Sequence, residues 1–154
     1  MEMRADLLIV GAGMVGSALA LALKDSGLKI LLLDGGPLSV KPFASEAPFE
    51  PRVSALSAAS QRILQRLGAW DGIIHRRASP YSHMHVWDGS GTGQIHFSAA
   101  SVHADVLGHI VENRVVQDAL LECLQGSCIE MLANSRLEQM RRSGDDWLLT
   151  LADG

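Results

Sequence analysis

The sequence is poor in cysteine and has no excess of basic residues. Its 154 residues include 2 cysteines, Cys123 and Cys128, which form no CxxC pair and indicate no disulfide framework. This scarcity fits a reducing compartment, so we expect a cytoplasmic protein. The 13 lysine and arginine residues are outnumbered by 17 aspartate and glutamate residues, and no basic block occurs. The electrostatic footprint of a nucleic-acid-binding protein is therefore missing.

A membrane-spanning run is also lacking. Residues 7–23 carry no charge, but a spanning helix needs about 20 apolar residues, and Gly11, Gly13 and Gly16 interrupt this stretch. No basic region precedes it, as a signal peptide would require. We interpret the stretch as a short buried strand, a glycine turn and a buried helix.

The sequence does contain enough apolar material for a core, at 47% hydrophobic residues, and a βαβ pattern over residues 5–34. This pattern is typical of an α/β fold with a parallel sheet. Its expected parts are a strand over residues 6–10, a glycine turn over 11–16, a helix over 14–26 that Gly27 ends, and a strand over 29–33.

The GxGxxG turn, set between a strand and a helix, predicts a dinucleotide site. Gly11 permits the tight turn, Gly13 lets the backbone approach a pyrophosphate, and Gly16 lets the helix pack closely on the strand. The start of the helix, at Met14 and Val15, presents free N–H groups and a positive dipole end to phosphates.

An acidic residue follows the second strand. Asp34 lies 23 residues after Gly11, a spacing at which a carboxylate accepts hydrogen bonds from an adenosine ribose. It would repel a 2′-phosphate, which disfavours NADP. The motif leaves FAD, NAD and a turn without any ligand as alternatives.

The rest of the chain predicts a mixture of loops, helices and hairpins. Residues 35–51 hold four of the five prolines and no periodicity, which indicates a long surface loop. The expected helices cover residues 57–67, with Ala59, Ile63 and Leu67 on one face, 70–77, and 113–125, with Val116, Leu120, Leu121 and Leu124 inward. The expected strands cover 83–88 and 94–97 as a hairpin, 107–111, 128–132 as a third parallel strand, and 136–142 with 147–151 as a final hairpin.

Two further residue sets invite other chemistry. His83 and His85 share a face of one predicted strand, and His96 lies on its partner. No acid or cysteine completes a ligand set, so we expect no metal site. Serines recur at threefold spacing, but without the GxSxG elbow of a hydrolase; helix capping explains Ser54, Ser57 and Ser60.

Later segments separate FAD from NAD. The segments Pro51–Ser60, Leu67–Asp71 and Leu107–Arg114 together resemble the FAD-dependent aromatic-ring hydroxylases of ubiquinone biosynthesis, within the flavoprotein monooxygenases. Residues 76–81 and 86–88 resemble the branch that acts on polyprenyl phenols and benzoquinols. The resemblance covers essentially the whole chain, which is similar to the N-terminal part of those enzymes.

The resemblance implies a Rossmann-like FAD-binding fold of the glutathione-reductase type, with an inserted β-hairpin and a terminal β-meander. It implies that Arg52 approaches the cofactor, as a guanidinium that can counter pyrophosphate charge; the alternative is a surface arginine that caps the next helix. It also implies that Asn113 reaches flavin-side oxygens or simply caps its helix. Arg114 is a further candidate. The reductant would be NAD(P)H, and the substrates dioxygen and a polyprenylated phenol or benzoquinol. No catalytic residue is indicated.

Family enzymes are more than twice this long, so we expect residues 1–154 to be an incomplete FAD-binding domain without a substrate domain, and inactive alone. Asp153-Gly154 is no convincing substitute for the family's second Asp-Gly motif. Exposed apolar surface then predicts self-association, and a polyprenyl substrate implies that the intact enzyme works at the membrane periphery or with other ubiquinone-pathway proteins. A non-catalytic nucleotide-binding module and the NAD-binding domain of a dehydrogenase remain alternatives.

Overall fold

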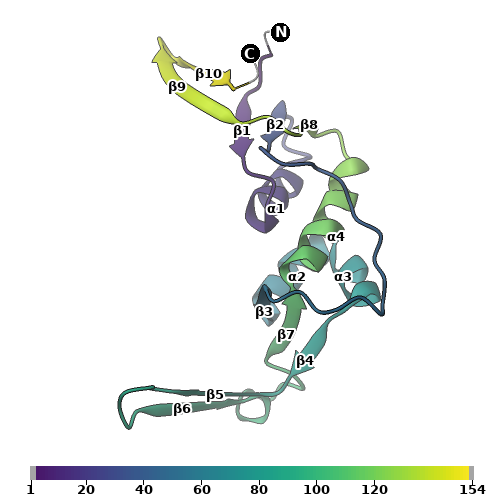
Figure 1. Ribbon diagram of the computed structural model, residues 1–154, viewed down its shortest axis with the longest axis vertical. Coiled ribbons are helices and arrows are strands. Elements are labelled where there is room, and N and C mark those ends of the chain that lie inside the picture. Colours follow the sequence, from purple (N-terminus) through teal and green to yellow (C-terminus); the bar gives the residue numbers. More distant parts are fainter. Residues whose placement is uncertain (1–2, 153–154) are drawn as a thin grey trace. The chain divides into compact units, whose positions relative to one another are not determined.

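The computed structural model describes residues 3–152, which form two compact units (Figure 1). Unit 1 contains residues up to Pro42 and from Gln117 onward, and unit 2 contains Phe43–Val116. The boundary between them falls inside the helix α4 (Asn113–Gln125). No helix within residues 3–152 is long and apolar enough to cross a membrane.

Unit 1 is built on a parallel sheet of three short strands in the order β1 (Leu7–Val10), β2 (Ile30–Leu33) and β8 (Glu130–Leu132). Each strand lies within the range predicted for it. Every residue of the central strand β2 is buried, which explains its unbroken apolar sequence. The core of this unit also includes Ile9, Ala20, Leu21, Leu120, Leu121 and Leu124.

The helix α1 (Met14–Ala22) ends four residues earlier than predicted. After Ala22 the N–H groups of Lys24 and Ser26 donate to carbonyls only three residues back, at 3.3 and 2.9 Å. Bonds of that span close tight turns and do not continue an α-helix. The chain then reaches Gly27, whose φ of +80° allows it to reverse into β2.

Unit 1 ends in an antiparallel pair, β9 (Leu137–Ser143) and β10 (Asp146–Leu151). The two strands were predicted, but within the described residues they form a two-stranded hairpin and not the expected meander. Asp153 and Gly154 lie outside the described residues.

Unit 2 contains an antiparallel sheet that the sequence patterns did not predict. Its order is β3 (Val53–Ser57), β7 (Gly108–Glu112) and β4 (Ser79–Tyr81). Of these, only β7 was expected. The strand β3 has no clear apolar pattern, because serine and alanine alternate with its apolar residues. The strand β4 contains Pro80, which argues against a strand in a sequence pattern but is tolerated at the edge of a sheet.

Two helices follow β3 and precede β4: α2 (Ala58–Arg66) and α3 (Trp70–Arg76). Ala59, Ile63 and Leu67 are predicted to share one face of α2, and the structure buries a different face. Leu64 is buried, whereas Ile63 is 56% exposed. The helix therefore presents the face that carries Leu64 to the core, and periodicity alone could not choose between two neighbouring apolar residues.

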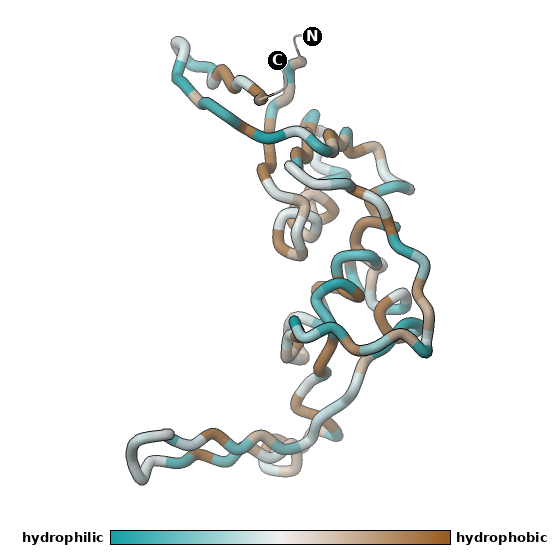
Figure 2. Tube along the Cα trace, in the orientation of Figure 1, coloured by the Kyte–Doolittle hydropathy of each residue, from teal (hydrophilic) through white to brown (hydrophobic). Residues whose placement is uncertain are grey.

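The remaining pair in unit 2 is the predicted hairpin of β5 (His83–Trp87) and β6 (Gln94–Ser98), followed by the short 3₁₀ helix η1 (Ala99–Val102). Hydropathy alternates along both strands (Figure 2), and the register places His85 opposite His96 and Met84 opposite Phe97. The histidines and Trp87 thus share one face, and Met84, Val86, Ile95 and Phe97 share the other. Residues 35–52, all described, hold neither helix nor strand.

Candidate functional site

The glycine turn of unit 1 connects β1 to α1. Gly11 has a φ of +100°, which a side chain would make unfavourable, and its N–H donates to the carbonyl of Leu33 at 2.7 Å. A Cβ atom on Gly16 would collide with the carbonyl oxygen of Gly11. The turn can therefore close only if Gly16 has no side chain.

Gly13 has a different role. A Cβ atom built on it would have no neighbour within 4 Å, and its φ of −68° suits any residue. Nothing in the packing of the protein therefore requires glycine here. The absent side chain leaves the backbone uncovered, and this open space beside Gly13, called the hollow below, is expected where a ligand approaches the main chain closely.

The start of α1 offers unused donors beside that hollow. Gly13 is the N-cap residue, it contributes no side-chain cap, and no acidic residue lies in the first turn. The first helical bond runs from Ser17 N–H to Gly13 O at 2.9 Å, so the N–H groups of Met14, Val15 and Gly16 precede it. Val15 is 82% exposed. The N–H groups that precede the first helical bond, together with the positive end of the helix dipole, would favour an anion at this end of α1.

Asp34 follows β2 directly and is fastened to the turn. Its Oδ2 accepts a hydrogen bond from the N–H of Ala12 at 2.7 Å, and its Oδ1 accepts one from the N–H of Gly36 at 2.8 Å. Each carboxylate oxygen has a second lone pair, so Asp34 can still accept from a hydroxyl. It braces the turn, a role that the spacing did not reveal, and it remains a candidate ribose ligand.

Two residues that the sequence patterns did not single out also hold this turn. The hydroxyl of Ser17 donates to the carbonyl oxygen of Ala12 at 3.0 Å, and Nε2 of Gln117 donates to the same oxygen at 3.1 Å. Gln117 is 105 residues away in sequence. The sequence predicts that Gln117 lies on a helix, but no residue near it in sequence indicates a contact with Ala12.

The other predicted site residues lie in unit 2, where β3 and α4 begin. The N–H of Asn113 donates to the carbonyl of Arg52 at 2.9 Å, so the structure brings these two residues together. The hydroxyl of Ser54 donates to Oδ1 of Asn113 at 2.6 Å, which turns the NH₂ group of that amide away from Ser54. Ser54 is therefore a partner of Asn113 on a strand, and the prediction that it caps a helix is wrong. Ser57 does cap α2, by accepting from the N–H of Ser60 at 3.3 Å.

Among the described residues, Arg52 and Arg114 differ in whether an ion pair already occupies the guanidinium group. The side chain of Arg52 is exposed. That of Arg114 forms an ion pair with Glu50, at 3.5 Å between Nη1 and Oε1. Arg52 is thus the more available of the two for an anionic ligand.

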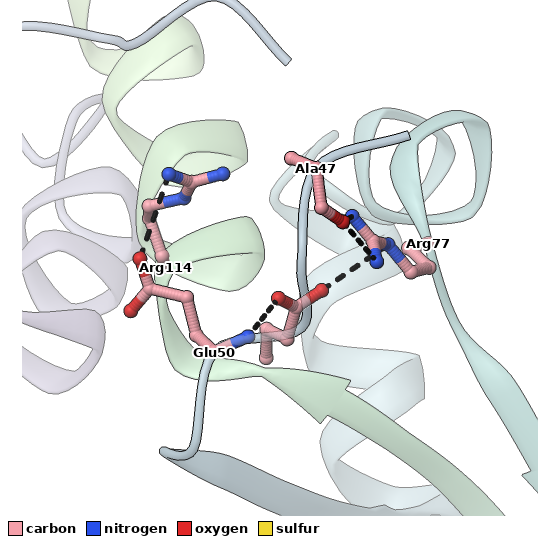
Figure 3. A network of polar contacts seen from close by, with 5 residues as sticks. Ala47, Glu50, Arg77 and Arg114 are labelled. Carbon is pink, nitrogen blue, oxygen red and sulfur yellow. Dashed lines mark hydrogen bonds and ion pairs between the residues drawn. The ribbon is translucent and has the colours of Figure 1, made fainter. Parts of the chain in front are cut away.

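A network of polar contacts holds the loop that precedes Arg52 (Figure 3). Arg77 pairs with the buried Glu112 at 3.3 Å, and both of its terminal nitrogens donate to the carbonyl of Ala47 at 3.1 Å. Glu112 in turn accepts from the N–H of Glu50 at 2.7 Å.

Aromatic residues of the same loop complete the surroundings of Arg77. Its guanidinium lies over the rings of Phe49 and Phe43, at 4.2 and 5.2 Å from the ring centroids. Residues 43–50 are consequently tied to β7 and to the end of α3 by one guanidinium group, through an ion pair, two hydrogen bonds and two ring contacts.

The three histidines of the β5–β6 hairpin lie close together, and their contacts include one another and Gln94. The rings of His83 and His96 stack at 5.6 Å, and Nε2 of His85 lies 3.2 Å from Oε1 of Gln94. Within residues 3–152, no group of three or more histidine, cysteine or acidic residues is arranged to hold a metal ion.

No protein-family model matches this chain, but curated relatives do. It is 33% identical over 151 residues to 3-demethoxyubiquinol 3-hydroxylase of Escherichia coli, covering 92% of this chain and 38% of that protein. It is 34% identical to the ubiquinone hydroxylase UbiL of Rhodospirillum rubrum, covering 97% of this chain and 34% of that protein. It is 40% identical over 124 residues to the ubiquinone biosynthesis monooxygenase COQ6 of Danio rerio, covering 78% of this chain and 25% of that protein. The chain thus spans well under half of these relatives.

Solved structures agree in fold. PqsL of Pseudomonas aeruginosa, a probable FAD-dependent monooxygenase, superposes with a TM-score of 0.68 at 21% identity, covering 97% of this chain and 39% of that one. The p-nitrophenol 4-monooxygenase PnpA of Pseudomonas putida gives 0.70 at 20% identity, covering 99% of this chain and 37% of that one. At these identities the likeness establishes a shared mixed α/β fold.

Proposed function

We propose, from the homology of this chain to the N-terminal portion of the ubiquinone-biosynthesis hydroxylases and monooxygenases, that it forms the FAD-binding part of an aromatic-ring monooxygenase. Its fold is shared with a probable FAD-dependent monooxygenase, which supports the choice of cofactor. The Rossmann-like arrangement around the glycine turn belongs to this proposal.

The observation that carries it is the open glycine turn of unit 1. The hollow at Gly13 would accept a pyrophosphate, with the N–H groups at Met14, Val15 and Gly16 as its donors. Asp34 would accept hydrogen bonds from the ribose hydroxyls through its remaining lone pairs. The donors and acceptors of these residues match the hydrogen-bonding chemistry of the adenosine diphosphate portion of the cofactor.

We also propose Arg52, Asn113 and Arg114 of unit 2 as cofactor ligands, each on the chemistry of its own side chain. The exposed guanidinium of Arg52 suits a phosphate or ribitol oxygen, and the NH₂ group of Asn113, turned by Ser54, suits a flavin oxygen. Arg114 would contribute only after giving up Glu50. A bound flavin would supply the redox chemistry, for which the protein provides binding and orientation.

The activity of the intact protein follows as part of this proposal. NAD(P)H would reduce the flavin, and dioxygen and a polyprenylated phenol or benzoquinol would be the substrates. Such a substrate favours work at a membrane surface or beside other ubiquinone-pathway proteins. No residue within 3–152 is assigned as a catalytic acid or base.

The test is a titration of the purified chain with FAD, ADP and NAD, followed by quenching of flavin fluorescence and by calorimetry. We expect FAD and ADP to bind, and Asp34→Ala to weaken both by about 1.5–3 kcal/mol, the scale for hydrogen bonds to a charged group. Asp25→Ala, which removes an exposed acid from the same unit, is the matched control. Unchanged affinities in Asp34→Ala would contradict the ribose assignment, and binding of NAD without FAD would favour a dehydrogenase domain instead.

A further inference from the structure

The peptide group that follows Ala12 is held more firmly than a turn residue requires. Ala12 is fully buried, and its carbonyl oxygen accepts hydrogen bonds from Ser17 Oγ at 3.0 Å and from Gln117 Nε2 at 3.1 Å. Its own N–H donates to Asp34 at 2.7 Å. Three side chains from three segments of unit 1 thus fix one alanine that has no functional side chain.

The geometry of the peptide bond gives this arrangement a consequence for the next residue. A trans peptide is planar, and its C=O and N–H bonds point in opposite directions; no cis peptide occurs among the described residues. The C=O of Ala12 and the N–H of Gly13 belong to the same peptide. Two donors that hold the oxygen on the inner side therefore direct the N–H of Gly13 to the outer side, where Gly13 is exposed and its missing side chain leaves the hollow.

We propose that Gln117, together with Ser17, is a positioning residue that aims the N–H of Gly13 at the phosphate of a bound adenine nucleotide. This inference rests on the proposed function, because it assumes that the hollow receives a phosphate. Gln117 acts through the peptide and does not touch the ligand.

The two donors do not contribute in the same way. Ser17 lies on α1, whose first turn contains the phosphate donors, so its hydroxyl ties the peptide to its own helix. Gln117 reaches the same oxygen from α4, on a distant part of the chain. Backbone donors that are already oriented before binding lose little freedom when the ligand arrives. Loss of the Gln117 bond leaves Ser17 as the one side-chain donor described at this oxygen, which should hold the orientation of the peptide less tightly.

The test compares ADP with adenosine, which presents the same base and ribose but no phosphate. The variant is Gln117→Met, which keeps the length of the side chain and removes the donor. Gln125→Met makes the same change at an exposed position of the same helix and is the matched control. We expect ADP affinity, measured by calorimetry, to fall about fivefold in Gln117→Met, as loss of one neutral hydrogen bond predicts. Adenosine affinity, measured by NMR titration, should stay constant, and Gln125→Met should bind both as the unaltered chain does.

Ser17→Ala provides a second variant, since it removes the other donor to the same oxygen and should also weaken ADP selectively. Equal affinity of Gln117→Met and the unaltered chain for ADP would overturn the inference. Equal weakening of ADP and adenosine would also overturn it, because a general structural role would then suffice. If the unaltered chain bound no ADP, the proposed function would fail first and this inference with it.

Discussion

The glycine turn of unit 1 and the loop before Arg52 in unit 2 are both irregular segments held in one conformation, but by different forces. The turn is held by glycine packing and by hydrogen bonds around Ala12, of which only the one to Asp34 involves a charge. The loop is held by the ion pair of Arg77 with a glutamate that is 3% exposed, and by two aromatic rings.

The two segments use different supporting groups because their backbones have different hydrogen-bonding needs. Two of the three side chains that support the turn, Ser17 and Gln117, are neutral, and both bind the carbonyl oxygen of Ala12, so they do not compete for the N–H groups of the helix. A loop with few backbone bonds of its own needs a group that satisfies many partners at once, and arginine has five donors in one plane. Loss of the charged support in unit 2 should therefore cost more than loss of a neutral hydrogen bond in either unit.

The largest effect is expected from breaking the buried ion pair. Glu112→Ala leaves the Arg77 guanidinium without its carboxylate and the N–H of Glu50 without its acceptor. Removal of one partner from a buried pair costs about 3–5 kcal/mol. Glu50→Ala is the control, because its carboxylate is 43% exposed and pairs at the surface, which is worth at most about 1 kcal/mol. Urea unfolding measures the free energy of unfolding of both variants. A similar loss in the two would show that the buried ion pair of Arg77 stabilises the protein no more than the surface pair of Glu50.

A pair of glycine substitutions should separate folding from binding within unit 1. Gly16→Ala places a Cβ atom against the carbonyl of Gly11 and should destabilise by about 3 kcal/mol, although alanine usually favours a helix by about 1 kcal/mol. Gly13→Ala meets no atom within 4 Å, so its stability should change by less than about 0.5 kcal/mol. Its Cβ would instead fill the hollow, and we expect ADP affinity to fall about tenfold, or about 1.4 kcal/mol. Normal ADP binding by Gly13→Ala would place the phosphate elsewhere.

The smallest effect concerns a neutral bond in unit 2. Ser54→Ala removes the 2.6 Å hydrogen bond to Asn113 and should lower stability by about 1 kcal/mol, so unit 2 would here behave like the neutral supports of unit 1. Ser90→Ala, at an exposed position in the loop of the β5–β6 hairpin, is the control and should change stability by less than about 0.5 kcal/mol. Thermal unfolding of the two variants gives the comparison, and equal midpoints would mean that the Ser54 bond is replaced by water at no cost.

Prediction from the sequence succeeded where neighbouring residues decide the structure. The buried run at β2, the glycine turn, the helix α4 with its inward Leu120 and Leu124, and the β5–β6 hairpin all lie where their patterns placed them. It failed for β3 and β4, which are short, half-exposed and stabilised mainly by pairing with β7. It did not indicate which face of α2 is buried, because that depends on what packs against the helix.

The sequence by itself thus determined the glycine turn, the acid that follows β2 and the family resemblance, because backbone preferences and motif spacing act over a few residues or one βαβ unit. Only the tertiary structure decided what supports these features. Gln117 reaches Ala12 from 105 positions away, and Glu112 meets Arg77 and the N–H of Glu50 across three separate segments. Such partners depend on how the folded chain brings distant segments together, because the residues next to a side chain in sequence do not indicate which distant group it will bind.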